Sequence, residues 1–285
     1  MPHIVVTKIQ SMQQSLTVSE NEIAQYVIHN IDDVVTSTIT AMAKSTGTSE
    51  ASINRFCKKI GYKGFNSFKI ALAQESYYKT MNENNSEKHN DSLVSSVSHD
   101  YRQMLVNTSA MLDEDIVGYA ANAINKAEHV FIFATPTTSL VAQEFEFKLN
   151  MTGIFAKTSI DISFMRVAIN NMTADDLVII IAPTVLNNDL YQILALCKDR
   201  DATIVTITSS DSPKLVGLSN YKFIISDKIS TKHSVSLSNN LVYLYVIDVI
   251  YCSLLNQSKE RKRRRLNNNI ALSSLSATQD LYYNV

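Results

Sequence analysis

Hydrophobic residues in the first eighty positions recur at intervals of three and four, which is the spacing of an amphipathic helix. The first such stripe is formed by Ile23, Tyr26, Val27 and Ile31. Ser19, with Glu22 three residues later, predicts a capping box at the start of this helix. A short second helix is predicted over 39–44 and a third over 50–60.

The third helix has the clearest end signals in the chain. Ser49 is a favourable N-cap, and Gly61 stands at the position after the helix where left-handed backbone is common. Between Met81 and Ser92 the apolar periodicity stops and Asn, Glu, Ser and His dominate. We therefore predict a linker over 81–92.

The pattern changes after residue 128 to short, continuously apolar runs that alternate with helical segments. Strands are predicted over 130–133, 177–181, 203–207 and 221–225, and a helix over 189–198. Such strands are typical of a parallel sheet covered by helices on both faces. Two polar loops, 134–139 and 182–188, follow the first two strands. In this kind of sheet, ligands bind at the carboxyl ends of the strands.

These patterns predict a two-domain protein, which its 285 residues can accommodate. The first domain, residues 1–80, is all-α. The linker follows, and residues 93–285 form an α/β domain with a parallel sheet flanked by helices.

Composition indicates folded, soluble domains, with 45% hydrophobic and 19% charged residues. Cys57, Cys197 and Cys252 lie far apart, so we expect buried, inert thiols; neither a metal site nor a cofactor is predicted. The N-terminus lacks the pattern of a signal peptide. The apolar stretch 241–255 is short for a membrane span and carries Asp248, which favours a buried helix. We expect a cytoplasmic protein without a membrane partner.

The segment 38–68 has the spacing of a helix-turn-helix, with a short helix, a turn at Gly47 and a second helix with a polar N-terminal face. The residues placed to reach base edges are Ser49, Glu50, Ala51, Ser52 and Asn54. The net charge of the chain is −1, so attraction to DNA requires a local basic patch. Between Lys44 and Lys79, seven basic residues stand against two acidic ones.

Four of these basic residues are candidate contacts to double-stranded DNA: Arg55, Lys58, Lys59 and Lys63. The alternative is the solvated face of a helical bundle. Arg55 could equally brace its own helix.

This stretch resembles the N-terminal domain of the RpiR family of bacterial sugar-metabolism regulators. The matching residues are Ala43, Ser49, Ile53, Arg55, Phe56, Lys58, Ile60, Gly61, Tyr62, Gly64 and Phe65. The resemblance implies a DNA-binding regulator of sugar or amino-sugar metabolism. It also implies that the second domain is a sugar isomerase (SIS) domain whose phosphosugar effector modulates operator affinity.

The two polar loops depart from the pattern of that family. Ala134 and Pro136 stand where glycines are expected, and Val185 replaces another glycine. Without these glycines the backbone N–H groups cannot approach a phosphate as closely, and the proline removes one N–H donor. The polar groups left for an effector are Thr135, Thr137, Thr138, Ser139, Thr184, Asn187 and Asn188. The domain therefore either binds an altered effector or serves mainly in dimerisation.

The predicted function is transcription regulation by a homodimer or homotetramer, without enzymatic activity. Residues 93–124 and 237–255 carry surplus apolar surface for dimerisation, and the basic run 259–265 is a solvated helix face or a contact to DNA phosphates. The alternative is an SIS-fold phosphosugar isomerase with an ancillary N-terminal domain. Its candidate acid/base residues are Glu144, Glu146 and His233.

Overall fold

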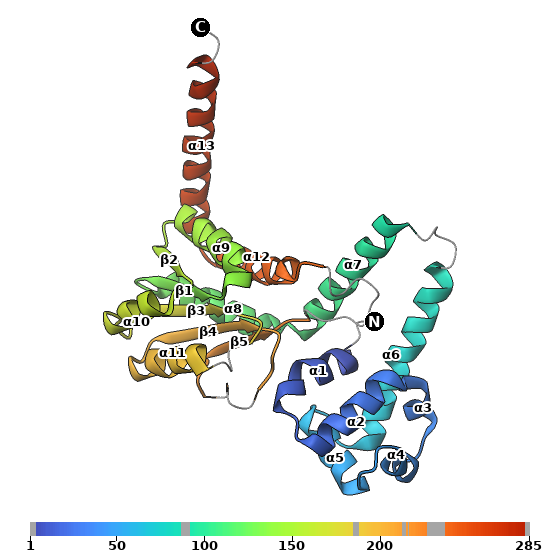
Figure 1. Cartoon of the computed structure of the whole chain (residues 1–285). Coiled ribbons are helices and arrows are strands. Elements are labelled where there is room, and N and C mark those ends of the chain that lie inside the picture. The colour runs from blue at the N-terminus through green and yellow to red at the C-terminus, as the bar shows by residue number, and fades with distance from the viewer. Residues whose placement is uncertain are drawn as a thin grey trace. The chain divides into compact units, whose positions relative to one another are not determined.

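The computed structural model of the chain describes residues 4–86, 92–184, 188–212, 215, 217–226 and 237–282. The chain divides into two compact units (Figure 1). The first comprises Met1–Met111 with Ser209–Pro213 and Ile224–Ser238. The second comprises Leu112–Thr208, Lys214–Phe223 and Asn239–Val285.

The first unit has an apolar core formed by residues between Val5 and Leu72 and is built from helices. They are α1 (Ile4–Met12), α2 (Val18–His29), α3 (Ile31–Thr36), α4 (Ile39–Ser45), α5 (Glu50–Lys59), α6 (Phe65–Ser86) and α7 (Leu93–Met111). A short 3-10 turn, η1 (Gln13–Ser15), joins α1 to α2. The largest core side chains of α5 and α6 are Phe56 and Phe68, both fully buried with ring centroids 6.3 Å apart.

The capping box of α2 lies two residues earlier than the sequence pattern predicted. Thr17, not Ser19, is the N-cap: its hydroxyl accepts from the Glu20 N–H, and the Glu20 carboxylate accepts from the Thr17 N–H at 2.8 Å. Both Ser/Thr-x-x-Glu pairs fit the sequence rule. The prediction of Ser19 was wrong because spacing alone does not select between overlapping pairs.

Helix α6 extends further than the predicted linker allows. It runs to Ser86, so 81–86 are helical, while residues 87–91 lie outside the described part of the chain. Helix α7 groups with the first unit by its contacts. A domain boundary in the 81–92 region, with domains over 1–80 and 93–285, remains our proposal.

The second unit contains a five-stranded sheet in the order β2-β1-β3-β4-β5. The strands are β1 (Val130–Ala134), β2 (Ala156–Ser159), β3 (Leu177–Ile181), β4 (Thr203–Thr208) and β5 (Tyr221–Ile224). The pairs β1/β2, β1/β3 and β3/β4 are parallel. All five residues of β3 are buried, which confirms the prediction of a central strand covered on both faces.

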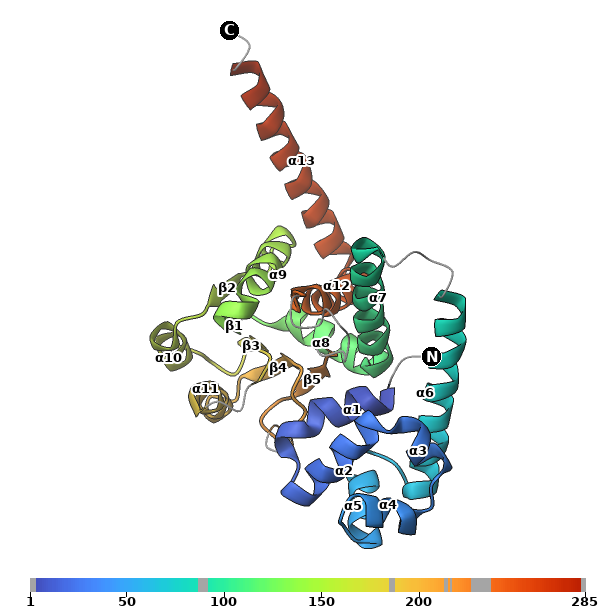
Figure 2. The same ribbon diagram turned by 45° about the vertical axis from the view of Figure 1, so that its right-hand side comes forward.

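Helices cover both faces of this sheet, as predicted. Figures 1 and 2 show α8 (Glu114–Lys126), α9 (Ser139–Met151) and α12 (Asn240–Gln257) on one face. The other face carries α10 (Ile162–Asn170) and α11 (Asn188–Asp199). From β1 the chain first adds β2 on one side and then β3 on the other. The loops after β1 and β3 therefore flank a topological switch point.

Helix α12 confirms the prediction of a buried helix, because eight of its eighteen residues are buried, among them Tyr243 and Ile247. No single helix in the described ranges is long and apolar enough to cross a membrane. Among these residues, α12 and the segment 259–273 of α13 (Lys259–Tyr282) pass that test together, but they are bent by 112° at their junction. Cys252 on α12 is exposed, so the expectation that all three cysteines are buried was wrong for this residue.

The apolar surface of α8 and α12 is largely used inside the second unit. The two helices pack against each other, and the buried face of α8 consists of Val117, Ala120, Ala121 and Ile124. Tyr119 of α8 and Leu241 of α12 are exposed, but most exposed large apolar residues of this unit lie on other elements, such as Phe147 of α9, Phe164 of α10 and Leu266 of α13. The apolar residues of α8 and α12 expected to form a dimer interface are therefore mostly buried within one chain, whereas Leu93, Val94 and Val106 of α7, in the same predicted surface, are exposed.

Candidate nucleic-acid interface and effector loop

The turn between α4 and α5 is fixed by local geometry. Gly47 has φ +61°, a left-handed conformation that favours glycine. The Thr48 N–H donates to the Ala43 carbonyl at 3.0 Å and closes the turn. Ser49 then starts α5, because its hydroxyl accepts from the Ser52 N–H at 3.1 Å. The predicted N-cap is thus confirmed.

The far end of α5 is fixed by a Schellman motif. The Tyr62 N–H donates to the Cys57 carbonyl at 2.9 Å, and the Gly61 N–H to the Lys58 carbonyl at 3.0 Å. Gly61 has φ +93°, as its predicted position after the helix requires. Because both ends are held, α5 is oriented by its own caps as well as by packing.

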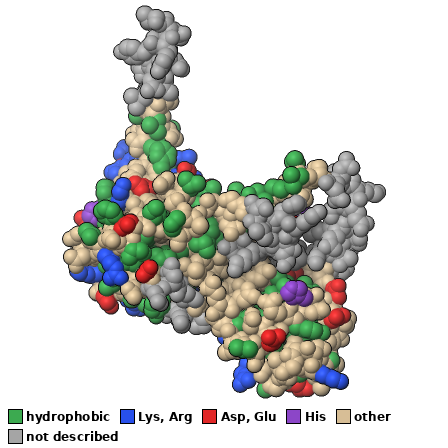
Figure 3. Space-filling model, in the orientation of Figure 1, with side chains coloured by type: hydrophobic (Ala, Val, Ile, Leu, Met, Phe, Trp, Pro, Cys, Tyr) green, Lys and Arg blue, Asp and Glu red, His purple; other side chains and the backbone are tan. Residues whose placement is uncertain are grey.

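One face of α5 is buried and the opposite face is exposed. Ile53, Phe56 and Cys57 are buried against the core, and burial raises the pKa of the Cys57 thiol to about 12. Ala51, Arg55 and Lys58 are exposed, at the spacing of one helix face. Figure 3 shows Lys and Arg side chains at the end of this unit where Figure 1 places α4 and α5.

Two candidate DNA-contacting residues at the start of α5 also bond within the unit. The Thr40 hydroxyl on α4 donates to the Glu50 carboxylate at 2.5 Å, so Glu50 ties the two helices together. The Arg55 guanidinium donates to the Ser52 hydroxyl at 3.2 Å while remaining exposed. Arg55 therefore both braces its helix and presents a cation at the surface.

Asn54 has a structural partner across the turn after α5. Its amide oxygen accepts from the Phe65 N–H at 3.2 Å, at the start of α6. The residue lines an open pocket of about 450 Å³ with Lys63 and Gly64. The Asn54 side chain and the exposed Lys63 thus lie beside each other at one end of the α5 surface.

Lys59 points away from the exposed face of α5. Its ammonium group donates to the Glu20 carboxylate at 2.6 Å and to the Ser15 carbonyl at 2.9 Å. Burial acts to raise the pKa of Glu20, but the hydrogen bonds from Lys59 and Thr17 and the Lys59 charge outweigh it, so the pKa is lowered. Lys59 is thus part of the packing between α2 and α5.

Fewer basic side chains are exposed around α4 and α5 than the sequence count predicts. Lys69 donates to the Ser37 carbonyl at 2.6 Å, and its ammonium lies over the Phe65 ring. The basic residues that remain exposed around α4 and α5 are Lys44, Arg55, Lys58 and Lys63. Lys44 was not among the predicted DNA contacts, and its exposure beside α5 adds it to the candidate surface.

The loop after β1 brings its predicted effector residues together, but their hydroxyl groups are bonded to one another. Thr138 is 1% exposed, and its hydroxyl donates to the Ile181 carbonyl at the end of β3, at 2.6 Å. The Thr135 hydroxyl lies 3.0 Å from the hydroxyl of Thr138 and 2.9 Å from that of Thr137. The Ser139 hydroxyl donates to the Pro136 carbonyl at 2.9 Å.

This loop leads directly into α9. Residues Pro136–Thr138 form a 3-10 turn, and α9 begins at Ser139 without a side-chain cap from Thr138. The turn is closed by a capping box between Thr135 and Thr138, and the N-terminus of α9 follows the carboxyl end of β1. The positive end of a helix dipole at such a position suits an anion.

The remaining predicted effector residues belong to the loop after β3. Thr184 is half-buried and follows β3 closely. Asn187 lies outside the described residues, as does the side chain of Asn188, whose backbone begins α11. Only Thr184 of this set is placed near the switch point by the structure.

The carboxylates considered as acid/base candidates have structural partners. The Thr158 N–H donates to Glu146 at 2.7 Å, which joins α9 to β2. Glu144 lies 3.6 Å from the Lys148 ammonium. His233 lies outside the described part of the chain.

Comparison with known proteins agrees with both units. Residues 4–79 match the helix-turn-helix domain of the rpiR family, and residues 123–253 match the SIS domain. The chain is 26% identical over 249 residues to the HTH-type transcriptional regulator HexR of Escherichia coli, which covers 86% of each chain. It is 27% identical over 264 residues to an uncharacterised HTH-type transcriptional regulator of Haemophilus influenzae, covering 90% of this chain and 91% of that protein.

A solved structure has the same fold over nearly the whole chain. The Vibrio vulnificus NanR protein, complexed with ManNAc-6P, superimposes with a TM-score of 0.60 at 20% identity. The match covers 95% of this chain and 98% of that one.

Proposed function

This chain belongs to the RpiR family of helix-turn-helix transcriptional regulators with an SIS domain, and from that premise we propose that α4 and α5 bind a double-stranded DNA operator. The observation that carries the proposal is the exposed face of α5, polar and basic, on a helix whose two ends are both fixed. A rigid helix of this kind can enter the major groove N-terminus first.

The residues of this surface have different proposed roles. Ser49, Glu50, Ala51, Ser52 and Asn54 stand at the N-terminal part of α5, where base edges are read. Arg55, Lys58, Lys63 and Lys44 are exposed cations for phosphates. We leave Lys59 out of the interface because its ammonium is bonded to Glu20 and Ser15.

Titration of the protein with DNA from its own promoter neighbourhood tests this proposal. For Arg55→Ala combined with Lys58→Ala, we expect affinity to fall about tenfold or more, and the slope of log affinity against log salt to fall by about two. Lys157→Ala is the matched control, since this lysine of β2 is 67% exposed in the other unit. Unchanged salt-dependent binding in the double variant would refute the assignment.

We further propose that the protein acts in the cytoplasm as a homodimer or homotetramer. Two-fold symmetry presents paired recognition helices to a palindromic operator. The role of an effector is then a linkage effect, because a ligand changes operator affinity only by binding the DNA-competent and incompetent states unequally.

The proposed effector is a phosphosugar-like molecule at the carboxyl edge of β1 and β3. The position of the two loops at the switch point of the sheet supports it. The NanR neighbour is complexed with a sugar phosphate, which suggests the class of compound to test. The proposed contacts are Thr135, Thr137, Thr138, Ser139, Thr184, Asn187 and Asn188.

Thermal unfolding with a panel of sugar phosphates, including hexosamine phosphates and ManNAc-6P, tests the effector proposal. A ligand of the native state raises the melting temperature with its concentration. The matched unphosphorylated sugars and inorganic phosphate serve as controls. Absence of any shift across the panel would favour a domain that serves only in assembly.

We propose that the protein is not an enzyme. The support is that Glu146 holds α9 to β2 and Glu144 pairs with Lys148, so neither carboxylate is reserved for proton transfer. Incubation with the same sugar phosphates, followed by NMR, should show no isomerisation. Turnover that is abolished by Glu144→Gln would instead support a phosphosugar isomerase.

A further inference from the structure

The connection between α5 and α6, residues 60–64, carries one exposed lysine. In the part of the chain that the structure describes, no hydrogen bond or ion pair engages the ammonium group of Lys63. The residue lines the pocket of about 450 Å³ beside α5, together with Asn54 and Gly64. Because binding orders a long side chain and its backbone at a cost in entropy, what Lys63 can bind depends on how firmly its connection is held.

The connection is held on both sides of Lys63. Before it, the Tyr62 ring packs edge-on against Phe68, with ring centroids 5.6 Å apart. After it, the Gly64 N–H donates to the Ser67 hydroxyl at 3.2 Å, and this hydroxyl donates back to the Gly64 carbonyl at 2.9 Å. The backbone of the lysine is therefore fixed before any ligand binds.

Asn54 joins this connection to the exposed side of α5. Its amide oxygen accepts from the Phe65 N–H at 3.2 Å, across 11 residues of sequence. The two segments pass so close that a Cβ added at Gly64 would lie 3.4 Å from this oxygen. Asn54 thereby sets where Lys63 stands relative to the exposed cations of α5.

The same bond fixes which polar groups Asn54 presents to DNA. Only the amide oxygen can accept from the Phe65 N–H, so the remaining polar group of the side chain is Nδ2, with two N–H donors. The usual recognition of adenine by asparagine uses the oxygen and the nitrogen together. With its oxygen engaged, Asn54 offers donors, which suit an anionic phosphate oxygen.

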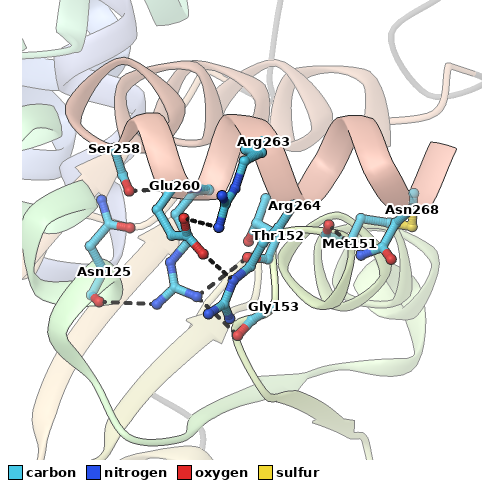
Figure 4. Close-up of polar contacts among 10 residues, drawn as sticks. Asn125, Met151, Thr152, Gly153, Ser258, Glu260, Arg263, Arg264 and Asn268 are labelled. Atoms are coloured by element: carbon cyan, nitrogen blue, oxygen red, sulfur yellow. Dashed lines mark hydrogen bonds and ion pairs between the residues drawn. The ribbon is translucent and has the colours of Figure 1, made fainter. Parts of the chain in front are cut away.

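The basic run of α13, predicted as a solvated face or a contact to DNA phosphates, has much of its charge paired within its own unit (Figure 4). The Arg261 guanidinium donates to the Gly153 carbonyl at 2.9 Å. Arg263 and Arg264 each lie 2.8 Å from the Glu260 carboxylate. These arginines would have to exchange existing partners for a phosphate, whereas the lysine beside α5 has none to exchange among the described residues.

We propose that a backbone phosphate of the operator binds at the pocket beside α5, between the Lys63 ammonium and the Asn54 Nδ2 group, and that Asn54 is the positioning residue for Lys63. The inference rests on the proposed DNA-binding role of α5 and deepens it. It narrows the role of Asn54 from reading a base to holding the DNA backbone, so its contribution is the same for every base sequence.

Titration of the full chain with DNA from its own promoter neighbourhood, at several salt concentrations, tests the site. Lys63→Ala should weaken binding about fivefold at about 0.15 M salt and lower the log–log salt slope by about one, because one phosphate loses its cation. Asn54→Ala should lower affinity at least as much, with the same change in slope. The double variant should then lose little more than Asn54→Ala alone, because both residues act on one phosphate. Additive losses, or a wild-type slope in Asn54→Ala, would overturn the positioning role.

Asn66→Ala is the matched control. Asn66 is an exposed asparagine that lines the same pocket, and its side chain makes none of the bonds that hold the connection. It should keep the wild-type slope, and an equal loss of slope would overturn the role given to Asn54. Urea unfolding identifies a merely structural role, in which Asn54→Ala is less stable but keeps the wild-type salt slope. That result would also overturn the proposal.

Operators with one phosphate at a time replaced by an uncharged methylphosphonate locate the contact. At one position in each half-site, the replacement should weaken binding by the wild type but not by Lys63→Ala or Asn54→Ala. If Asn54→Ala stays sensitive where Lys63→Ala does not, Asn54 does not position Lys63. Base-pair substitutions in the operator should affect Asn54→Ala and the wild type by equal factors. A difference at one base pair would return Asn54 to base reading.

These outcomes can be told apart from failure of the DNA-binding function. Loss of binding by Arg55→Ala with Lys58→Ala, but wild-type binding by Lys63→Ala, would overturn the phosphate site alone. Unchanged salt-dependent binding in all of these variants would overturn the proposed function of α5 as well.

Discussion

Helix α5 and the loop after β1 are both short polar segments held between buried elements, yet they use their polar groups differently. On α5, the capping hydroxyl of Ser49 fixes the helix, while Arg55 and Lys58 stay exposed. In the loop, the hydroxyls of Thr135, Thr137 and Thr138 bond to one another or to the end of β3. The candidate binding groups of α5 that carry charge are exposed, whereas the hydroxyl groups of the loop are already hydrogen-bonded.

The two segments differ in whether their polar groups can bind a partner without rearrangement. A surface whose caps and charged groups are distinct can bind without rearranging, so its affinity depends on the groups it exposes. A loop whose hydroxyls also hold the fold must exchange existing bonds for new ones. Substitution of the exposed cations Arg55 and Lys58 should therefore affect mainly binding, whereas substitution of a bonded hydroxyl in the loop should affect stability first.

The largest expected effect is on the loop side. Thr138→Val removes the hydroxyl that donates to the buried Ile181 carbonyl and leaves this acceptor without that bond, so we expect a loss of about 1–3 kcal/mol in unfolding free energy. Thr137→Val, at an exposed position, should cost less than about 0.5 kcal/mol. Urea unfolding measures both. Equal losses in the two variants would contradict the distinction between them.

Ser49 distinguishes the stability of α5 from its binding. Ser49→Ala removes the N-cap and should cost about 1 kcal/mol of stability. Ser49→Asp keeps a capping oxygen and should retain stability, while its negative charge at the proposed interface weakens DNA binding. Thermal unfolding and DNA titration together check this. If Ser49→Asp binds DNA as the wild type does, the N-terminus of α5 does not approach DNA.

The neighbouring lysines of α5 should behave in opposite ways. Lys58→Ala should reduce the salt dependence of DNA binding by about one in the log–log slope and leave stability within about 0.5 kcal/mol. Lys59→Ala should lower stability by up to about 1 kcal/mol, because it removes the partner of Glu20. The measurements are DNA titration at several salt concentrations and urea unfolding. Reversal of the two effects would mean that Lys59, and not Lys58, faces the DNA.

The smallest effect is a pH dependence. The pKa of Glu20 is lowered in the folded state, so its stabilisation is present above the unfolded value of 4.5. It is lost as the pH falls through the folded pKa. Lys59→Ala should therefore reduce the decrease in stability below about pH 4.5, and have little influence on the pH dependence near neutrality. Unfolding curves from pH 3 to 7 compare the variant with the wild type.

Sequence rules correctly predicted those parts of the fold that depend on neighbouring residues in the chain. Ser49 and Gly61 were correct because a cap depends on a few neighbouring residues. Strand β3 was correct because its five apolar residues are all buried. Strand β2 was missed because its sequence, Ala-Lys-Thr-Ser, is mostly polar and only its first residue is buried at the edge of the sheet. Its pairing with β1 supplies what its composition does not.

Residue roles at the candidate sites depended on contacts between distant segments. Nothing in the sequence near Lys59 indicates its pairing with Glu20, thirty-nine residues away. The apolar residues of α12 were interpreted as surplus because their packing against α8 and α9 is tertiary. The hydroxyls of Thr135 and Thr138 were identified as polar groups in a loop, but their mutual bonding could be found only in three dimensions.

The bond from Thr138 to the Ile181 carbonyl has a consequence for the concentration at which a sensor responds. A ligand that recruits this hydroxyl must first release it, so a closed loop lowers the apparent affinity by the population of the open one. If opening costs about 1–3 kcal/mol, the dissociation constant rises by about 5- to 150-fold. If the proposed effector binds here, the loop would respond only at a high concentration of that metabolite and would ignore a scarce one.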